Sequence, residues 1–152
     1  MTIDKFEGRY AFLSNFTPAP VVLDGVRYPS VEHAYQAAKT VDPAERETVR
    51  SAPSAAKAKR AGKTVTKRPD WEAVRLPVMA DLTVQKYAPG SSYAVLLVAT
   101  GDEELIEGNW WHDYFWGQCN GQGQNHLGKL LMARRTTLNG LHNAKEPPCP
   151  VL

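Results

Sequence analysis

The sequence has few of the residues that build metal and disulfide sites. Its two cysteines, Cys119 and Cys149, lie far apart without CxxC spacing, so neither a zinc site nor a disulfide framework is indicated. The four histidines lack HExxH spacing, and no GxSxG motif or catalytic Cys–His pattern is present. We therefore expect no metal and no cofactor, and we interpret Cys119 as structural.

Long apolar runs and strong charge are also missing. The longest apolar run, YAVLLVA at 93–99, is far shorter than the roughly 20 residues that a membrane-spanning helix needs. Asp4, Glu7 and Arg9 stand where a signal peptide would require an apolar stretch. The formal net charge of +2 is too small to indicate a nucleic-acid or membrane partner by itself. We expect a cytoplasmic protein in a reducing compartment, without a membrane partner.

What is present fits one globular domain. The 152 residues are 43% hydrophobic and 22% charged, which allows a buried core, and no internal repeat or linker divides the chain. Residues 1–142 are expected to form this domain, and NAKEPPCPVL at 143–152 to form a loose tail. The patterns predict an α+β fold, mainly helical, with a small antiparallel sheet.

The sheet is expected near the N-terminus and the helices after it. Strands and turns dominate residues 1–30, where Asp24-Gly25 in VVLDGVRY favours a hairpin because both residues tolerate positive φ. Helix starts are indicated at Ser30 and at Asp42, the latter with Glu45 in a capping-box position. The remaining predictions are helices over 54–62, 71–87 (bent or broken at Pro77), 91–101 and 125–138, a short strand in EELIEG, and a loop over 108–124.

The segment PSVEHAYQAAKT, residues 29–40, gathers polar side chains on one side of its predicted helix. At 100° per residue, Glu32, Gln36 and Lys39 fall within an arc of roughly 60°, and Tyr35 lies at its edge. The opposite side consists of the small residues Ala34, Ala37 and Ala38. Charges at helical spacing usually form a solvated face. The alternative is the wall of a site, where a carboxylate and an amine reach the same substrate.

The loop GNWWHDYFWGQCNGQGQNHLG, residues 108–128, concentrates aromatic residues and glycines. Three of the four tryptophans lie here, where rigid rings suit stacking on a planar ligand. Asp113 lies among them, and a carboxylate in apolar company suits a general acid. Gly117, Gly121 and Gly123 lead into a helix start whose backbone N–H groups would suit a phosphate. The alternative is a glycine-rich turn with its tryptophans folded inward.

Basic residues are concentrated between residues 57 and 68. Six occur within twelve positions: Lys57, Lys59, Arg60, Lys63, Lys67 and Arg68. Most such runs are solvated faces, but this one could approach a phosphate backbone.

Four stretches together resemble, in order, the blocks of the NADAR superfamily, the YbiA-like N-glycosidases: GRYAFLSNF, YPSVEHAYQAAK, LLVATGDEELIEGN and DYFWGQCNGQGQNHLGKLLMARR. The resemblance runs from about Phe6 to Arg135 and is weak around residues 57–70 and after Leu138. It implies a mainly helical α+β fold and hydrolysis of N-glycosidic bonds to ribose phosphates. The implied substrates are a ribosylaminopyrimidine phosphate of early riboflavin synthesis, or ADP-ribose attached to guanine in DNA or RNA.

The resemblance also implies catalytic groups. It implies a lysine that forms a Schiff base with ribose C1, and this lysine corresponds to Lys39. The glutamate of the same block is Glu32, and the acid of the tryptophan loop is Asp113. We hypothesise that Lys39 is the nucleophile and that Glu32 and Asp113 transfer protons. In the alternative, water attacks directly, Glu32 is the base, and Lys39 binds phosphate or hydroxyl.

Further residues are predicted to bind the substrate. Asn15 is expected at the ribose or the base edge, Tyr35 and Trp116 against a planar or apolar surface, and Gln36 beside Tyr35 on the floor of the site. The phosphate end is assigned to Gly117, Gly121 and Gly123, and to Arg9, for which a surface role is equally compatible with the sequence.

Other classes of function are compatible with parts of the sequence. A module that binds ADP-ribose or NAD without turnover would not need a nucleophile beside two acids, so this function is disfavoured. A structural nucleic-acid-binding protein is indicated by the basic run alone. Within the enzyme interpretation, the basic run favours ADP-ribose linked to nucleic acid over the riboflavin-pathway metabolite. The sequence does not indicate an oligomeric state.

Overall fold

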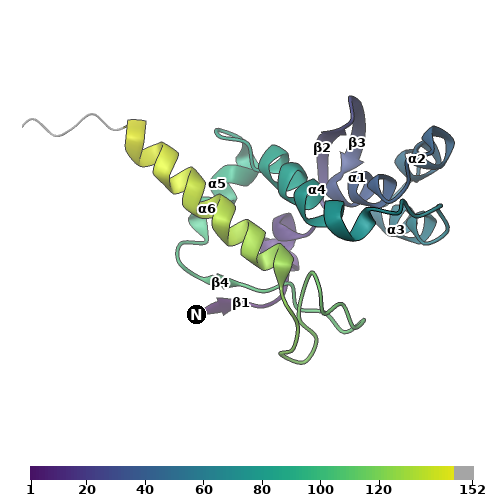
Figure 1. Ribbon diagram of the computed structural model, residues 1–152. Coiled ribbons are helices and arrows are strands. Elements are labelled where there is room, and N and C mark those ends of the chain that lie inside the picture. The colour runs from purple at the N-terminus through teal and green to yellow at the C-terminus, as the bar shows by residue number, and fades with distance from the viewer. Residues whose placement is uncertain (146–152) are drawn as a thin grey trace, which may run out of the picture. The chain divides into compact units, whose positions relative to one another are not determined.

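The computed structural model describes residues 1–145, and Figure 1 shows its helices and strands. The chain forms two compact units. The first unit comprises Lys5–Lys86, and the second joins Met1–Asp4 to the chain from Tyr87 onward. The expected mainly helical α+β class is confirmed. The expected domain boundary at residue 142 stays a prediction, and most of the expected tail, residues 146–152, lies outside the described residues.

The first unit begins with a short helix and a hairpin. The 3-10 helix η1 (Gly8–Leu13) lies in a region where the sequence predicts only strands and turns. Strands β2 (Pro18–Leu23) and β3 (Val26–Ser30) pair antiparallel. The predicted turn between them is confirmed, because Asp24 and Gly25 have φ angles of 48° and 78°.

Helix α1 is the centre of the first unit. The helices of this unit are α1 (Val31–Ala38), α2 (Pro43–Arg50), α3 (Ala55–Gly62) and α4 (Trp71–Lys86). As predicted, α1 begins at Ser30, whose hydroxyl accepts a hydrogen bond from the His33 N–H at 3.1 Å. The other three helices and both hairpin strands pack against α1 (Figure 1). Its alanine side is fully buried, because small side chains let neighbouring elements approach closely.

The capping box predicted for α2 does not form. Asp42 caps the helix as expected, and its carboxylate accepts a hydrogen bond from the Ala44 N–H at 2.8 Å. Glu45 does not return to the Asp42 N–H, which donates instead to the Thr40 hydroxyl. The Glu45 carboxylate accepts hydrogen bonds from the Thr40 hydroxyl and from the Thr66 N–H. These tertiary partners replace the local one.

The break considered at Pro77 does not occur either. Helix α4 runs without interruption from Trp71 to Lys86, with Pro77 inside it. A proline in a helix interior removes one backbone hydrogen bond and costs roughly 3 kcal/mol. Trp71, Met79 and Leu82 are buried from the same helix, and the burial of such side chains contributes enough to offset that cost.

The second unit has its own small sheet and two helices. Strand β1 (Thr2–Ile3) pairs with β4 (Glu104–Leu105) in parallel, whereas the sequence predicts an antiparallel sheet only. Helix α5 (Ser92–Ala99) forms as expected and stops before Gly101, which has a φ angle of 65°. It packs against α6 (His126–Lys145).

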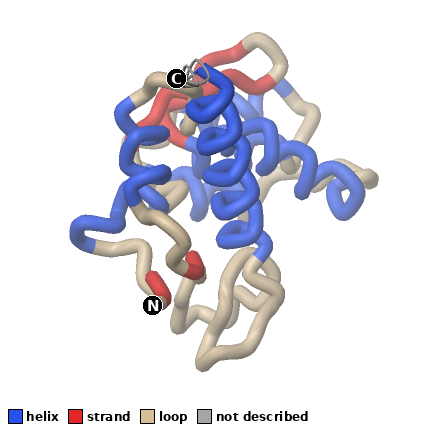
Figure 2. The backbone as a smooth tube through the Cα atoms, turned by 90° about the vertical axis from the view of Figure 1, so that its left-hand side faces the viewer, coloured by secondary structure: helices blue, strands red, loops and turns tan. Residues whose placement is uncertain are grey.

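Helix α6 is longer than its sequence pattern indicates. The amphipathic pattern predicts a buried stripe of Leu127, Leu130, Leu131 and Leu138, and all of them except the half-buried Leu130 are buried. The helix continues to Lys145 instead of ending near Leu138. The long loop between β4 and α6 leads into its first turn (Figure 2). Among the described residues, no helix combines the length and the apolar character that crossing a membrane requires.

Candidate active site

The polar stripe of α1 is buried, so its interpretation as a solvated face is wrong. Glu32 is 6% exposed, Gln36 is 4% exposed and Tyr35 is 7% exposed, while Lys39 is half-buried at the end of the helix. Charged and amide groups are rarely buried unless they have polar partners or a function. The stripe therefore belongs to the interior of the first unit and forms the nucleus of a candidate site.

Gln36 holds the carboxylate of Glu32. Its side-chain N–H donates to Glu32 Oε1 at 2.7 Å, one helical turn away. The Gln36 Oε1 atom is buried, and no residue within 1–145 provides it with a hydrogen-bond partner. That atom faces Gly62 of α3 so closely that a Cβ on Gly62 would lie 2.0 Å from it. Gln36 is thus an orienting residue, pressed between Glu32 and the α3 backbone.

Lys39 lies in a setting that favours its neutral form. Its Nζ lies 5.7 Å from the centre of the Tyr35 ring. Burial lowers the pKa of the Lys39 ammonium below the ordinary value of 10.5. The Glu32 carboxylate opposes this shift, whereas the positive charges of Lys67, Lys59 and Lys63 add to it. A lowered pKa increases the fraction of neutral lysine, and the neutral amine is the form that acts as a nucleophile.

The aromatic side of the site consists of Tyr35 and of Trp71, which the sequence pattern does not assign to the site. The Tyr35 ring packs on Trp71, the first residue of α4, with ring centres 5.2 Å apart and a tilt of 52°. Trp71 is buried, and sequence reasoning treats it only as a helix start. No local signal pairs residues so far apart in the chain, so this contact was missed.

Asn15 lies at the start of α1. Its backbone carbonyl accepts a hydrogen bond from the Glu32 N–H at 3.1 Å, which places Asn15 next to the polar stripe of α1. Its half-buried side-chain amide points to the Met79 sulfur at 3.6 Å. Arg9, in contrast, is exposed and stacks on Tyr10 at 4.7 Å from the ring centre. The phosphate role of Arg9 stays a prediction.

In the second unit, Asp113 has a clear structural task. Its Oδ1 accepts hydrogen bonds from the Phe115 N–H at 3.1 Å and the Trp116 N–H at 2.9 Å. The Asn109 side chain bonds both the N–H and the carbonyl of Asp113. These bonds fix the turn that carries Trp116. The structure thus brings Asn15, Glu32, Tyr35, Gln36 and Lys39 together, and it describes Asp113 and Trp116 within their own loop.

The backbone N–H groups expected to bind a phosphate at the start of α6 already have partners within the protein. The N–H groups of residues 124–127 all donate to backbone carbonyls of residues 114–117. Gly117 and Gly123 are required for this close packing, because a Cβ on either would lie within 2.3 Å of a backbone oxygen. Gly121 has a φ angle of 75°. Phosphate binding by the three glycines stays a prediction.

The tryptophans of the loop are not all folded inward. Trp110 is 81% exposed, and Trp111 is exposed as well. Trp116 is half-buried and packs edge-on against Phe115, with ring centres 4.8 Å apart. The interpretation as an inward-folded turn is therefore wrong for Trp110 and Trp111, and the exposed rings can meet a planar partner.

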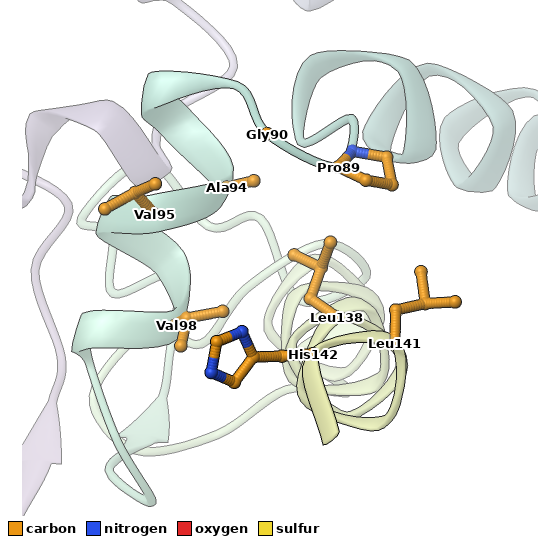
Figure 3. A pocket seen from close by; sticks show the side chains of 8 residues that line it. All are labelled: Pro89, Gly90, Ala94, Val95, Val98, Leu138, Leu141 and His142. Atoms are coloured by element: carbon orange, nitrogen blue, oxygen red, sulfur yellow. The ribbon is translucent and has the colours of Figure 1, made fainter. Parts of the chain in front are cut away.

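A groove in the second unit differs from the α1 site in its chemistry. It has a volume of about 420 Å³ and lies between α5 and α6 (Figure 3). Its lining is mostly apolar and consists of Pro89, Gly90, Ala94, Val95, Val98, Leu138, Leu141 and His142. It contains no carboxylate or amine for proton transfer or nucleophilic attack. Within residues 1–145, no three His, Cys, Asp or Glu side chains are placed to hold a metal ion.

Comparison with known proteins shows which family the chain resembles. The NADAR domain model matches residues 4–139. "N-glycosidase YbiA" of Shigella flexneri serotype 5b (strain 8401) is 38% identical over 132 residues, covering 85% of this chain and 82% of the relative. A "Riboflavin biosynthesis protein" of Vibrio vulnificus (strain YJ016) is 39% identical over 132 residues, covering 85% of this chain and 36% of the relative.

A solved structure agrees with both results. The NMR structure of the E. coli protein YbiA superimposes with a TM-score of 0.81 at 32% identity, covering 99% of this chain and 92% of the other. The family match spans nearly all described residues, and it includes the α1 stripe and the aromatic loop. On this sequence and structural similarity, the chain belongs to the NADAR domain family.

Proposed function

We propose that this protein is an N-glycosidase that releases ADP-ribose from the exocyclic amine of guanine in nucleic acid, through a Schiff base on Lys39. Family membership and the names of the relatives support the general reaction, hydrolysis of an N-glycosyl bond. The observation that carries the lysine chemistry is the half-buried Lys39 with a lowered pKa, in a site whose carboxylate, Glu32, is held by Gln36.

The chemistry follows from the ring-opened form of an N-riboside. When the sugar ring opens, C1 becomes an iminium carbon bound to the base nitrogen. Neutral Lys39 adds to C1 and forms a C–N bond, and a proton moves from the lysine nitrogen to the base nitrogen with the help of a carboxylate. The bond between C1 and the base then breaks, the free base leaves, and C1 remains as the lysine imine. Water adds to this imine and releases the sugar and the Lys39 amine.

Each residue of the site has a role in this scheme. Glu32 accepts and returns the protons, while Gln36 holds its carboxylate in place. Tyr35, braced by Trp71, supports the substrate beside Lys39, and Asn15 bonds the ribose or the base edge. Asp113 is proposed as a second proton-transfer group, and Trp116 as a surface for the base.

Borohydride trapping tests the lysine intermediate. Reduction during turnover should attach the sugar covalently to Lys39, and mass spectrometry of the digested protein locates the adduct. Lys39→Ala should give neither adduct nor product. An active Lys39→Ala variant, together with no adduct on the wild type, would contradict the Schiff base and favour direct attack by water.

A second substrate is favoured by a specific similarity. The Vibrio relative is named for riboflavin biosynthesis, and a ribosylaminopyrimidine 5′-phosphate also carries ribose on an exocyclic amine. Both substrates should be offered to one purified sample, and release of free base should be followed by chromatography. Turnover of the pyrimidine alone would reassign the substrate. Binding of ADP-ribose without release of base from either substrate would identify a non-catalytic binding module.

A further inference from the structure

The basic segment from Gly62 to Arg68, at the end of α3 and just after it, contacts α1 or the residues next to it at three points. Gly62 packs against the Gln36 side chain. The Arg68 N–H donates to the Lys39 carbonyl at 2.7 Å. Between these points, the Thr66 N–H and hydroxyl bond the Glu45 carboxylate, which also bonds Thr40, the residue after Lys39. The backbone from 62 to 68 is therefore held beside Lys39.

Three lysines in α3 or shortly after it lie close enough to Lys39 for their charges to act on it. Burial is the main cause of the lowered pKa of Lys39, and the positive charges of Lys67, Lys59 and Lys63 add to it. Lys59 and Lys63 are one helical turn apart and lie on one side of α3. Lys67 contacts Glu72 at 3.8 Å, and Glu72 also pairs with Arg75 at 2.8 Å. The Arg68 guanidinium, in contrast, turns away to Asp70 at 2.6 Å.

An aromatic ring completes this surface. Phe16 is 43% exposed, although a large apolar side chain next to the core could be buried more fully. The Lys59 Nζ lies 5.9 Å from the centre of the Phe16 ring. Phe16 follows Asn15, whose carbonyl bonds the Glu32 N–H, so the ring belongs to the same neighbourhood as the catalytic stripe.

We propose that Lys59, Lys63 and Lys67, with Phe16 beside Lys59, form an anion-binding subsite that holds the phosphate of the substrate sugar next to Lys39. This inference rests on the proposed function. Like charges brought together destabilise each other, and a bound phosphate relieves that repulsion and accepts charge-assisted hydrogen bonds from all three ammonium groups. The 5′-phosphate of a ribose is only a few bonds from C1. A phosphate held here therefore presents C1 to the Lys39 amine.

The proposed subsite places the phosphate at the lysines, whereas the sequence analysis placed it at the glycine-rich loop. The first N–H groups of α6 are already bonded to carbonyls of the loop. The three lysines carry full charges, and they lie in the same unit as Lys39, Glu32 and Asn15. Their charges therefore attract a phosphate to the neighbourhood of the nucleophile.

The test compares a triple Lys59→Gln, Lys63→Gln, Lys67→Gln variant with a matched control, Lys57→Gln. Lys57 is an exposed lysine of α3, and two residues before Lys59 it lies on another side of the helix. Inorganic pyrophosphate is the probe, and its binding is measured by calorimetry. We expect the triple variant to lose about tenfold or more in pyrophosphate affinity, while the control binds like the wild type. Equal affinity in all three proteins would overturn the subsite.

Kinetics with a ribosylaminopyrimidine 5′-phosphate and its dephosphorylated form give the second readout. The triple variant should raise KM about tenfold for the phosphorylated substrate only, with kcat at its own pH optimum changed less than about threefold. If the wild type turns over both substrates, an increase in KM for the ADP-ribosylated oligonucleotide and none for the phosphorylated pyrimidine would show that the lysines bind the nucleic-acid strand, which contradicts the proposal. If the wild type releases no base at all, the N-glycosidase proposal fails, and the pyrophosphate measurement still decides the subsite.

Discussion

Helix α1 and the loop between β4 and α6 both combine carboxylates with aromatic rings, yet they use their carboxylates differently. The Glu32 carboxylate accepts a hydrogen bond from another side chain, Gln36, within a buried stripe that also carries Lys39. The Asp113 carboxylate accepts two backbone N–H groups of its own turn. The difference teaches that a carboxylate in apolar company can serve either chemistry or loop geometry, and that its partners distinguish the two.

The largest effect is expected at Lys39. Lys39→Met should lower kcat by about 10³-fold or more, because no other amine replaces the nucleophile. Its melting temperature should stay the same or rise by about 2 °C, since a half-buried charge is replaced by an apolar side chain. Chromatographic rate assays and thermal unfolding monitored by circular dichroism measure both. Retained activity would remove the basis for treating α1 as the reactive region.

Glu32 is expected to come next. Glu32→Gln keeps the shape of the side chain but removes its ability to shuttle protons, so kcat should fall by about 10²-fold to 10³-fold. Gln36→Glu serves as a partner variant, because it places a second carboxylate against Glu32 and should disturb the pH profile. Steady-state kinetics across pH provide the measurement. A Glu32→Gln variant with wild-type kcat would show that this carboxylate is structural, like that of a capping residue.

Asp113 sharpens the comparison directly. In Asp113→Asn the side-chain oxygen can still accept the N–H groups of Phe115 and Trp116, so the turn should persist and the melting temperature should not change. The kcat should nevertheless fall about tenfold if the carboxylate transfers a proton. Asp113→Ala, which loses both functions, should also destabilise by about 1 kcal/mol. Unchanged kcat in Asp113→Asn would leave the loop with a purely structural carboxylate.

A substitution at Gly62 tests the close contact between α3 and the Gln36 side chain. A Cβ in Gly62→Ala would meet Gln36 Oε1 at 2.0 Å, so the Gln36 side chain must move away from Glu32. We expect a loss of about 1–3 kcal/mol in the free energy of unfolding and a lower kcat. Gly140→Ala is the matched control, because no atom of the described residues lies within 4 Å of a Cβ placed there, and alanine favours a helix by up to about 1 kcal/mol relative to glycine. Urea titrations should move the two midpoints in opposite directions.

The smallest effect concerns pH. The pKa of Lys39 is lowered, so the neutral amine and kcat/KM should increase with pH below 10.5. Lys67→Gln removes a positive charge and should move this rise to higher pH. Between the folded pKa and 10.5 the unfolded chain binds more protons than the folded chain, so stability should also rise with pH. Lys39→Met should lose that part of the stability profile, and an unchanged profile would contradict the assigned pKa.

Local signals were sufficient for much of the first unit. The Asp24-Gly25 turn, the Ser30 cap and the Asp42 cap depend on neighbouring residues only, and all three were predictable. Glu45 was not, because its partners Thr40 and Thr66 reach it through the tertiary fold.

The candidate site shows the same limit. Helical periodicity placed Glu32, Gln36 and Lys39 on one side, but it could not show that this side is buried, since burial depends on α3, α4 and the hairpin. Trp71 behind Tyr35 and the basic segment beside Lys39 required the folded chain as well. The resemblance to the NADAR superfamily supplied the catalytic hypothesis that periodicity could not.

The hydrogen bond from the Arg68 N–H to the Lys39 carbonyl makes the hydrogen-exchange rate of the Arg68 amide a reporter on the site. An amide bonded in this way exchanges its hydrogen with solvent only when the segment opens, so its exchange rate measures how often the basic segment separates from the reactive lysine. A bound anion should slow that exchange, while the amide of Lys57 on α3 keeps its rate. One backbone signal would then report occupancy of the site in the absence of any turnover.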